Sequence, residues 1–202
     1  MSVTVVVCLM AAFLLGGIPF SHLIARLRGV DLRSVGSGNI GATNLARALG
    51  YGMGALGLLL DAGKGAAAVL IPGAVLGARA TPTIEALAAA MAILGHSFTP
   101  FLRFKGGKGV ATGAGAFAVL APRATLVALA VFAVVVTLTR VVGLGSVLAA
   151  LTLPVAAHLF GAARPVTLTA GLVSILVIAR HRANLARLLR GSEHRLGARE
   201  GP

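Results

Sequence analysis

The chain has 202 residues, of which 57% are hydrophobic and 11% charged, and its formal net charge is +13. Because soluble globular domains carry about 25% charged residues, this composition excludes an ordinary soluble domain and favours an all-helical membrane protein. Strongly basic chains often bind nucleic acid, but here the basic residues lie between apolar runs without interleaved aromatic residues. We therefore expect a membrane-embedded protein with no nucleic-acid partner.

Residues 1–202 are expected to form a single integral-membrane domain, because no polar stretch is long enough for a separate soluble one. Its basic C-terminal segment, 180–202, is expected to be cytoplasmic. No Lys or Arg precedes the first apolar run, which is therefore expected to stay as a helix and not to be removed as a signal peptide. Cys8 is the only cysteine, which excludes a thiolate metal cluster, and we expect neither a metal nor a cofactor.

Seven apolar stretches predict a polytopic bundle of about seven transmembrane helices. In chain order they cover residues 3–25, 51–77, 84–95, 110–121, 124–139, 143–160 and 166–179. A helix needs about 20 residues to cross about 30 Å of hydrocarbon, so the third to sixth stretches are expected to be tilted or partly re-entrant, and five or six spans remain an alternative. In the second stretch, Asp61, Gly63, Lys64 and Gly65 predict a break in the helix.

The distribution of basic residues predicts the orientation of the bundle. Seven spans place fourteen of the eighteen Lys and Arg residues on one side, and cytoplasmic loops are enriched in such residues. The amino terminus is therefore expected outside and the carboxyl terminus inside. An even number of spans separates the three long polar segments, so all three are expected to face the cytoplasm.

The first long polar segment, residues 34–47, combines three glycines with hydroxyl, amide and guanidinium groups. Backbone N–H groups of small residues can converge on a phosphate, and a helix beginning at about Thr43 would add the positive end of its dipole. Arg47 could supply a bidentate charge. The alternative is a flexible polar loop in which Asn or Thr caps the next helix.

The second long polar segment, residues 95–109, contains the sequence Lys105-Gly-Gly-Lys-Gly109. Two lysines beside consecutive glycines supply point charges and exposed backbone donors, and a helix resuming at Val110 would direct its amino-terminal end at an anion. The alternative is a basic loop that only sets the topology. Three phenylalanines at every third position predict a face resting on the bilayer: Phe98, Phe101 and Phe104.

The third segment, residues 179–193, has leucines at helical spacing and arginines over much of the remaining surface. This pattern predicts an amphipathic helix on an anionic leaflet. His181 and Asn184 lie three residues apart, hence on one helix face, and suit hydrogen bonds to a polyol. Asp61 and Lys64 are also three apart but lie inside a span, where they form either a structural pair that shapes the site or a direct ligand contact.

Taken together, these motifs resemble the bacterial PlsY family of acyl-phosphate-dependent glycerol-3-phosphate acyltransferases. The resemblance rests on Gly36-Ser-Gly-Asn-Ile-Gly-Ala-Thr-Asn-Leu-Ala-Arg47, on Gly95-His and Lys-Gly-Gly-Lys-Gly109, and on His181-Arg-Ala-Asn-Leu-Ala-Arg-Leu-Leu-Arg-Gly-Ser-Glu193. The element Asp61-Ala-Gly-Lys-Gly65 is also similar to that family's, whereas Ile40 stands where proline is expected.

The resemblance implies transfer of a fatty acyl group from acyl phosphate to the sn-1 hydroxyl of glycerol 3-phosphate, giving lysophosphatidic acid and phosphate. It implies a site at the cytoplasmic face of the bacterial inner membrane, in contact with membrane lipid. Acyl-CoA, acyl-carrier protein, a metal or an obligate protein partner are not expected to take part.

Both substrates carry a phosphate, so the two glycine-rich basic segments fit the need for two anion sites. We expect catalytic roles for Ser37, Arg47, Lys108, His181 and Asn184. Substrate-binding positions are expected at Gly38, Asn39, Thr43, Asn44, Asp61, Lys64, His96, Lys105, Gly106, Gly107 and Glu193. The proton of the acceptor hydroxyl would pass either to a substrate phosphate oxygen or to a histidine.

Two other functions remain as alternatives. Buried basic groups and broken helices also occur in small transporters or channels for anionic solutes. Here, however, most of the polar groups are predicted to lie on one side of the membrane. A structural lipid-binding protein would explain the C-terminal arginines but gives Lys105 and Lys108 no task.

Overall fold

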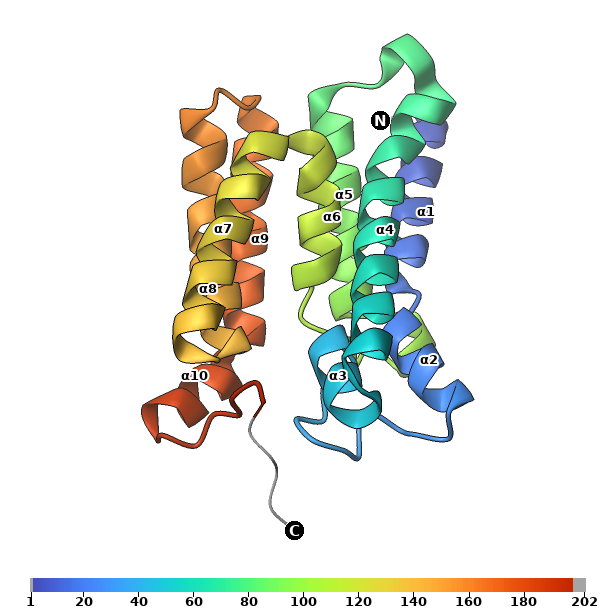
Figure 1. Cartoon of the computed structure of the whole chain (residues 1–202). Coiled ribbons are helices and arrows are strands. Elements are labelled where there is room, and N and C mark those ends of the chain that lie inside the picture. The colour runs from blue at the N-terminus through green and yellow to red at the C-terminus, as the bar shows by residue number, and fades with distance from the viewer. Residues whose placement is uncertain (1, 198–202) are drawn as a thin grey trace. The chain divides into compact units, whose positions relative to one another are not determined.

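The computed structural model describes residues 2–197, and within them it contains ten α-helices, two short 3-10 helices and no strand (Figure 1). The α-helices are α1 Val3–Gly17, α2 Phe20–Leu27, α3 Ala42–Leu49, α4 Tyr51–Leu76, α5 Pro82–Ser97, α6 Val110–Leu120, α7 Pro122–Thr139, α8 Val142–Leu159, α9 Arg164–Arg180 and α10 Arg182–Leu189. The predicted all-helical class is confirmed. The predicted basic segment 180–202 extends beyond the described residues, because 198–202 lie outside them.

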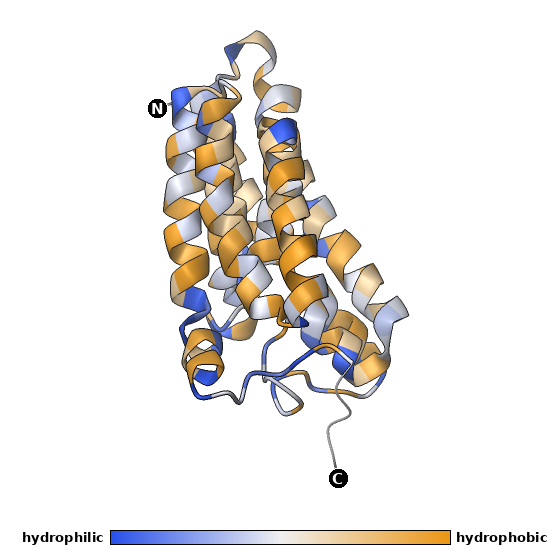
Figure 2. Ribbon diagram, turned by 60° about the vertical axis from the view of Figure 1, so that its left-hand side comes forward, coloured by the Kyte–Doolittle hydropathy of each residue, from blue (hydrophilic) through white to orange (hydrophobic). Residues whose placement is uncertain are grey.

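Each of the seven predicted apolar stretches is mostly helical, but the first is divided into α1 and α2 at Ile18 and Pro19 and is not one continuous helix. In the part of the chain that the structure describes, five helical runs are long and apolar enough to cross a membrane: Val3–Leu27, Tyr51–Arg79, Pro82–Leu102, Pro122–Thr139 and Val142–Leu159. A sixth is formed if α9 and α10, which meet at a bend of 54°, count as one span. With 11 residues, α6 is short, and at 1.5 Å per residue it falls well below the ~30 Å of a hydrocarbon core. Figure 2 shows the hydrophilic residues concentrated in the connecting loops.

The break predicted within residues 51–77 is wrong. Helix α4 runs without interruption through its 26 residues, with Pro72 inside it. Asp61 and Lys64 do not interrupt α4 because they form an ion pair across one turn, with Lys64 Nζ 2.8 Å from Asp61 Oδ1. The charges therefore stabilise each other inside the apolar helix instead of forcing the backbone open.

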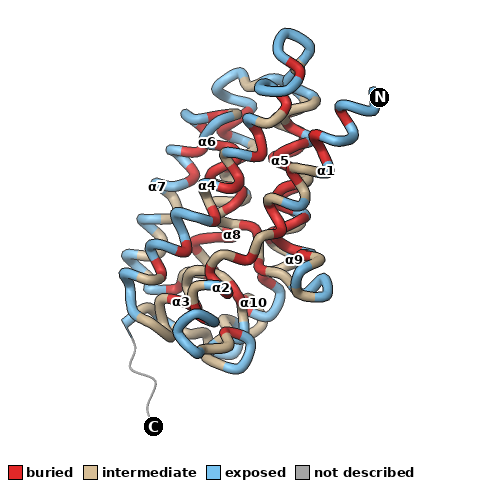
Figure 3. Tube along the Cα trace, turned by 90° about the vertical axis from the view of Figure 1, so that its right-hand side faces the viewer, coloured by how far each residue is buried: buried red, intermediate tan, exposed pale blue. Residues whose placement is uncertain are grey.

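The chain divides into two compact units, Met1–Leu120 and Ala121–Pro202. In the first unit α1 packs on α5 and α4, and α6 packs mainly on α4. In the second unit α8 contacts both α7 and α9. Buried positions, red in Figure 3, recur along α1, α4 and α5.

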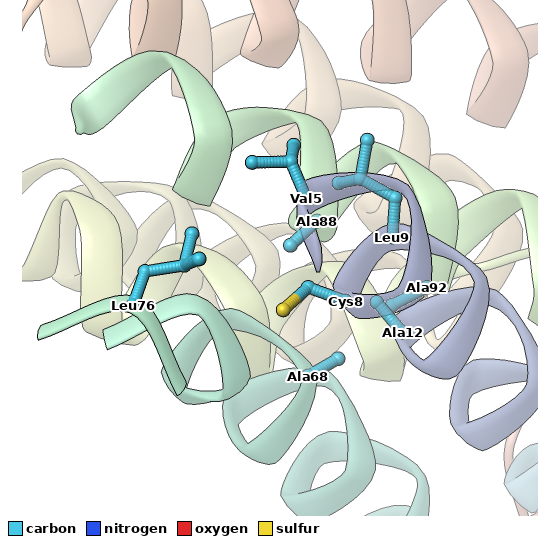
Figure 4. Close-up of a cluster of buried hydrophobic side chains, with 8 residues drawn as sticks. All are labelled: Val5, Cys8, Leu9, Ala12, Ala68, Leu76, Ala88 and Ala92. Atoms are coloured by element: carbon cyan, nitrogen blue, oxygen red, sulfur yellow. The ribbon is translucent and has the colours of Figure 1, made fainter. Parts of the chain in front are cut away.

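Small residues bring the helices of the first unit close together. The buried cluster drawn in Figure 4 joins α1, α4 and α5 and contains four alanines and a cysteine beside larger residues: Val5, Cys8, Leu9, Ala12, Ala68, Leu76, Ala88 and Ala92. Between α4 and α6 two glycines meet the opposite backbone, since a Cβ at Gly65 would lie 2.0 Å from the Thr112 carbonyl oxygen and one at Gly115 would lie 1.8 Å from that of Ala62. Close backbone approach of this kind drives helix association where lipid is as apolar as the side chains.

Replacing Gly115 by Ala is predicted to separate α4 from α6. Because the new methyl group collides with backbone atoms of α4, we expect a loss of about 1–3 kcal/mol of stability. The matched control is Gly63→Ala in α4, where an added Cβ has no neighbour within 4 Å. Thermal unfolding in detergent should show a lower midpoint for Gly115→Ala alone, and equal midpoints would contradict the close packing.

Candidate active site

The first polar segment forms the loop between α2 and α3. Helix α3 begins at Ala42, close to the predicted start at Thr43, and its N-cap is Gly41 without a side-chain hydrogen bond. The alternative expectation of an Asn or Thr cap is therefore wrong. The side chain of Asn44, in the first turn, points back into the loop instead of capping its own helix.

Asn44 holds this loop in shape and is only 2% exposed. Its Nδ2 atom donates to the carbonyl oxygens of Leu32 at 2.9 Å and Val35 at 3.0 Å, and its Oδ1 atom accepts the backbone N–H of Ser37 at 3.0 Å. Gly36 has a positive φ of 51°, and a Cβ there would lie 2.5 Å from Asn44 Oδ1. The loop thus needs glycine at this position for both its backbone conformation and its contact with Asn44.

The predicted phosphate-binding residues lie around this fixed turn. Ser37 and Thr43 are half-buried, and Gly38 follows Ser37 with a positive φ of 68°. The Arg47 side chain reaches back toward the turn, since its Cδ atom lies 4.0 Å from the Cβ that Gly36 lacks. A serine backbone, a threonine hydroxyl and a guanidinium are therefore carried by one loop and the helix that follows it.

An exposed ion pair lies at the entrance to the same loop. Arg33 Nη2 is 2.7 Å from Asp31 Oδ2, and both the Arg33 Nε and the Arg33 backbone N–H donate to Asp31 Oδ1 at 3.0 Å. These hydrogen bonds to Arg33 hold the pKa of the Asp31 carboxyl well below its usual range. The carboxylate is therefore charged throughout the neutral range, and it keeps Arg33 close to the chain.

A buried polar network lies beneath the loops in the first unit. Asp61 Oδ1 pairs with Lys64, and Asp61 Oδ2 accepts the Ser21 hydroxyl at 2.9 Å. Lys64 Nζ donates to the Ile18 carbonyl oxygen at 2.6 Å and lies 5.8 Å from the centre of the Phe20 ring. Helices α2 and α4 and the bend between α1 and α2 thus meet at one ion pair.

The second polar segment connects α5 to α6. Lys105 is exposed and Lys108 is half-buried. The amides of Gly106 and Gly107 donate to the carbonyl oxygens of Ser97 at 3.2 Å and His96 at 3.0 Å. The predicted exposed backbone donors are therefore wrong at these two positions, because the chain folds back onto the end of α5 and uses the amides itself.

Other features of this segment agree with the sequence analysis. Helix α6 begins at Val110 as predicted. The three phenylalanines of the predicted bilayer face are exposed: Phe98, Phe101 and Phe104. The buried Thr99 hydroxyl donates to the Gly17 carbonyl oxygen at 2.6 Å, which fastens the segment to the end of α1.

The predicted site residues of the second unit lie at the junction of α9 and α10. His181 and Asn184 are 2% and 8% exposed, respectively. His181 Nδ1 lies 2.7 Å from the Val177 carbonyl oxygen, and Asn184 Nδ2 donates to Glu193 Oε1 at 2.5 Å. Since a carbonyl oxygen only accepts, Nδ1 carries the hydrogen and Nε2 is the basic nitrogen of the neutral ring.

Sequence reasoning missed two neighbours of Asn184. Arg187, one of the arginines of residues 179–193 that were expected to face an anionic leaflet, instead pairs with Glu193 at 2.8 Å between Nε and Oε2. Gly143 of α8 contacts the Asn184 side chain, since a Cβ there would lie 3.1 Å from it. The carboxylate of Glu193 among several arginines was a signal for the ion pair, whereas nothing in the sequence pointed to Gly143.

Three comparisons with known proteins bear on this site. The family model described as "Glycerol-3-phosphate acyltransferase" matches residues 6–191. The chain belongs to the glycerol-3-phosphate acyltransferase family. It is 47% identical over 191 residues to a glycerol-3-phosphate acyltransferase of Anaeromyxobacter dehalogenans, covering 92% of this chain and 94% of the relative. It is 46% identical to one of Syntrophotalea carbinolica, covering 95% and 97%.

Solved structures of PlsY (YgiH), an integral membrane glycerol 3-phosphate acyltransferase, also resemble this acyltransferase. The glycerol 3-phosphate form matches with a TM-score of 0.90 and 39% identity over 96% of each chain. The lysophosphatidic acid form matches with a TM-score of 0.87 and 37% identity, covering 96% of this chain and 95% of the other. The resemblance to the PlsY family inferred from the motifs is confirmed. The prediction of an integral-membrane acyltransferase is confirmed as well.

The structure groups the predicted residues of the acyltransferase into four sets. Ser37, Thr43, Asn44 and Arg47 belong to the first loop and α3; Asp61, Lys64 and His96 form the buried polar network; Lys105, Gly106, Gly107 and Lys108 lie in the loop between α5 and α6; and His181, Asn184 and Glu193 lie in the second unit. Gly38 and Asn39 lie in the first loop beside Ser37. Among residues 2–197, no group of three or more His, Cys, Asp or Glu side chains is placed to hold a metal ion.

Replacing Asn44 by Ala in the acyltransferase is predicted to release the first loop. The variant loses two donated hydrogen bonds and leaves the Ser37 amide without its acceptor, which should lower stability by about 1–3 kcal/mol. Hydrogen–deuterium exchange should accelerate over residues 35–38. Asn39→Ala is the control, since Asn39 takes no part in these hydrogen bonds, and equal exchange in both variants would contradict the assignment.

Proposed function

We propose that this acyltransferase transfers a fatty acyl group from acyl phosphate to the sn-1 hydroxyl of glycerol 3-phosphate, giving lysophosphatidic acid and inorganic phosphate. The observation that carries the proposal is a pair of glycine-rich basic loops, both in the first unit of a chain of this family. Relatives of known structure in glycerol 3-phosphate and lysophosphatidic acid forms support the acceptor and the product.

Phosphate recognition is assigned to the two loops. Ser37, Thr43 and Arg47 surround a turn that Asn44 holds in place, so little reorganisation is needed when an anion binds. Lys108 is half-buried in the second loop, the segment between α5 and α6. Its charge there is less screened by solvent than that of the exposed Lys105. Lys108 is therefore the stronger candidate for stabilising negative charge as the acyl group is transferred.

His181 and Asn184 are assigned to the glycerol hydroxyls. His181 is hydrogen-bonded to the Val177 carbonyl and Asn184 to Glu193. These hydrogen bonds fix the orientation of the two side chains. The proton of the attacking hydroxyl passes either to a phosphate oxygen of a substrate or to a histidine. Among histidines, His181 is suited to this task because its Nε2 is the basic nitrogen.

We further propose that residues 1–202 act as one acyltransferase domain in the bacterial inner membrane, with the three polar segments facing the cytoplasm. The excess of basic residues in these segments supports this orientation. The acyl chain would lie between helices and remain open to lipid. No cofactor or obligate protein partner is required by the proposed reaction.

Phosphate release from palmitoyl phosphate tests the proposed function. Purified protein should release phosphate only when glycerol 3-phosphate is present and should not use palmitoyl-CoA. Release without glycerol 3-phosphate, or none at all from folded protein, would contradict the proposal. Flux of phosphate or glycerol 3-phosphate through liposomes, without acyl transfer, would favour the transporter.

Lys108→Gln is predicted to lower the transfer rate about 100-fold or more, because it removes the charge assigned to the reacting phosphate. The matched control is Arg103→Gln, which removes one positive charge from an exposed position of the same segment. The control should keep most of the activity. Equal losses in the two variants would show that only the net charge of the loop matters.

The variant His181→Gln distinguishes between the two candidate proton acceptors, a phosphate oxygen of a substrate and the His181 imidazole. If a phosphate oxygen of a substrate accepts the proton, kcat at saturating glycerol 3-phosphate should stay within about tenfold while KM rises, because only hydroxyl positioning is weakened. If the imidazole is the base, kcat itself should fall by about 100-fold or more. Steady-state kinetics over a range of glycerol 3-phosphate concentrations distinguish these outcomes.

A further inference from the structure

We propose that Asp61, Lys64 and His96 form a positioning assembly for the second loop, and that this assembly controls phosphate-substrate binding without touching the substrate. The inference rests on the proposed role of residues 105–109 in binding phosphate. Of the two alternatives expected for Asp61 and Lys64, it selects the structural pair that shapes the site over direct ligand contact, and it gives His96 a positioning role.

The ion pair between Asp61 and Lys64 is buried in the first unit. Asp61 and Lys64 are 2% and 3% exposed within an apolar helix, and each makes one further hydrogen bond, with Ser21 and with the Ile18 carbonyl respectively. A buried ion pair adds little stability over well-packed apolar residues, because removing both charges from water offsets their attraction. The pair is therefore better explained by what it holds in place than by stability alone.

The Asp61 carboxylate lies close to the end of α5. His96 occupies the last turn of α5 and is 6% exposed. Its Nδ1 atom lies 3.8 Å from Asp61 Oδ1, the same oxygen that pairs with Lys64. The carboxylate thus faces the Nδ1 side of the imidazole at a separation longer than a hydrogen bond.

On its other side, His96 contacts the second loop at Gly107. A Cβ added to Gly107 would lie 2.2 Å from His96 Nε2, so the opposite edge of the imidazole rests directly on the Gly107 backbone. The carbonyl oxygen of His96 also accepts the Gly107 amide at 3.0 Å, and that of Ser97 accepts the Gly106 amide at 3.2 Å. His96 therefore holds Gly107 both through its ring and through its main chain.

The position of the loop sets the positions of its lysines. Gly106 and Gly107 separate Lys105 from Lys108, so a shift of the glycine backbone moves the charge assigned to phosphate. Lysine charges placed close to a phosphate attract it, and this attraction weakens as the charges move away. Loss of the assembly should thus appear as weaker binding of a phosphate substrate in a protein that remains folded.

The double variant Asp61→Asn/Lys64→Met tests the proposal, because it removes both charges together and leaves no unpaired one. With palmitoyl phosphate and glycerol 3-phosphate as substrates, we expect KM for at least one of them to rise tenfold or more, with a smaller change in kcat. The control Leu76→Ala in the apolar cluster of α4 should lower the melting temperature and leave both KM values unchanged. Unchanged KM values in the folded double variant would overturn the proposal.

His96→Gln extends the test to the connection itself. If the Asp61–Lys64 pair acts through His96, the triple variant Asp61→Asn/Lys64→Met/His96→Gln should lose less kcat/KM than the product of the losses in the double variant and in His96→Gln. Multiplicative effects would overturn the connection.

Hydrogen–deuterium exchange at Gly106 and Gly107 provides a readout that needs no activity. Both the double variant and His96→Gln should accelerate exchange there, and Leu76→Ala should not. Failure of the wild-type protein to transfer acyl groups would sink the proposed function alone, whereas unchanged exchange in both variants would sink the positioning role.

Discussion

The buried ion pair between Asp61 and Lys64 is the interaction on which the arrangement of the first unit depends. It allows α4 to cross an apolar environment unbroken, and it draws in Ser21 of α2 and the Ile18 carbonyl. Breaking one partner alone would leave an uncompensated charge among apolar helices, which is far more destabilising than replacing both. Packing, helix continuity and loop position are thus linked to a single carboxylate.

Close backbone contact is the second constraint, because lipid removes the hydrophobic drive for helices to associate. Gly65 and Gly115 let α4 and α6 touch, and in the same way Gly107 lets the second loop rest on His96. Glycine is used where two groups must approach, either two helices or a loop and a ring. The same residue type thereby builds the membrane bundle and shapes the candidate phosphate site.

The sequence was sufficient to predict the apolar stretches, the starts of α3 and α6 and the family. These features depend on local composition and on motif spacing. It was insufficient where the choice of partner decides the outcome. The continuity of α4 depends on the pairing of two charges, the use of the Gly107 amide depends on the carbonyl of His96, and the direction of Arg187 depends on Glu193. The spacing of Asp61 and Lys64 does not show whether the helix continues through them, and the other two pairings leave no periodic signal in the chain.

The measurement that tests the central claim most directly is the stoichiometry of products formed by the purified protein from palmitoyl phosphate and glycerol 3-phosphate. Mass spectrometry of the lipid and a phosphate assay should show one lysophosphatidic acid, acylated at the first hydroxyl, for each phosphate released. Phosphate released in excess of acylated product, or an acyl group at another position, would contradict the account.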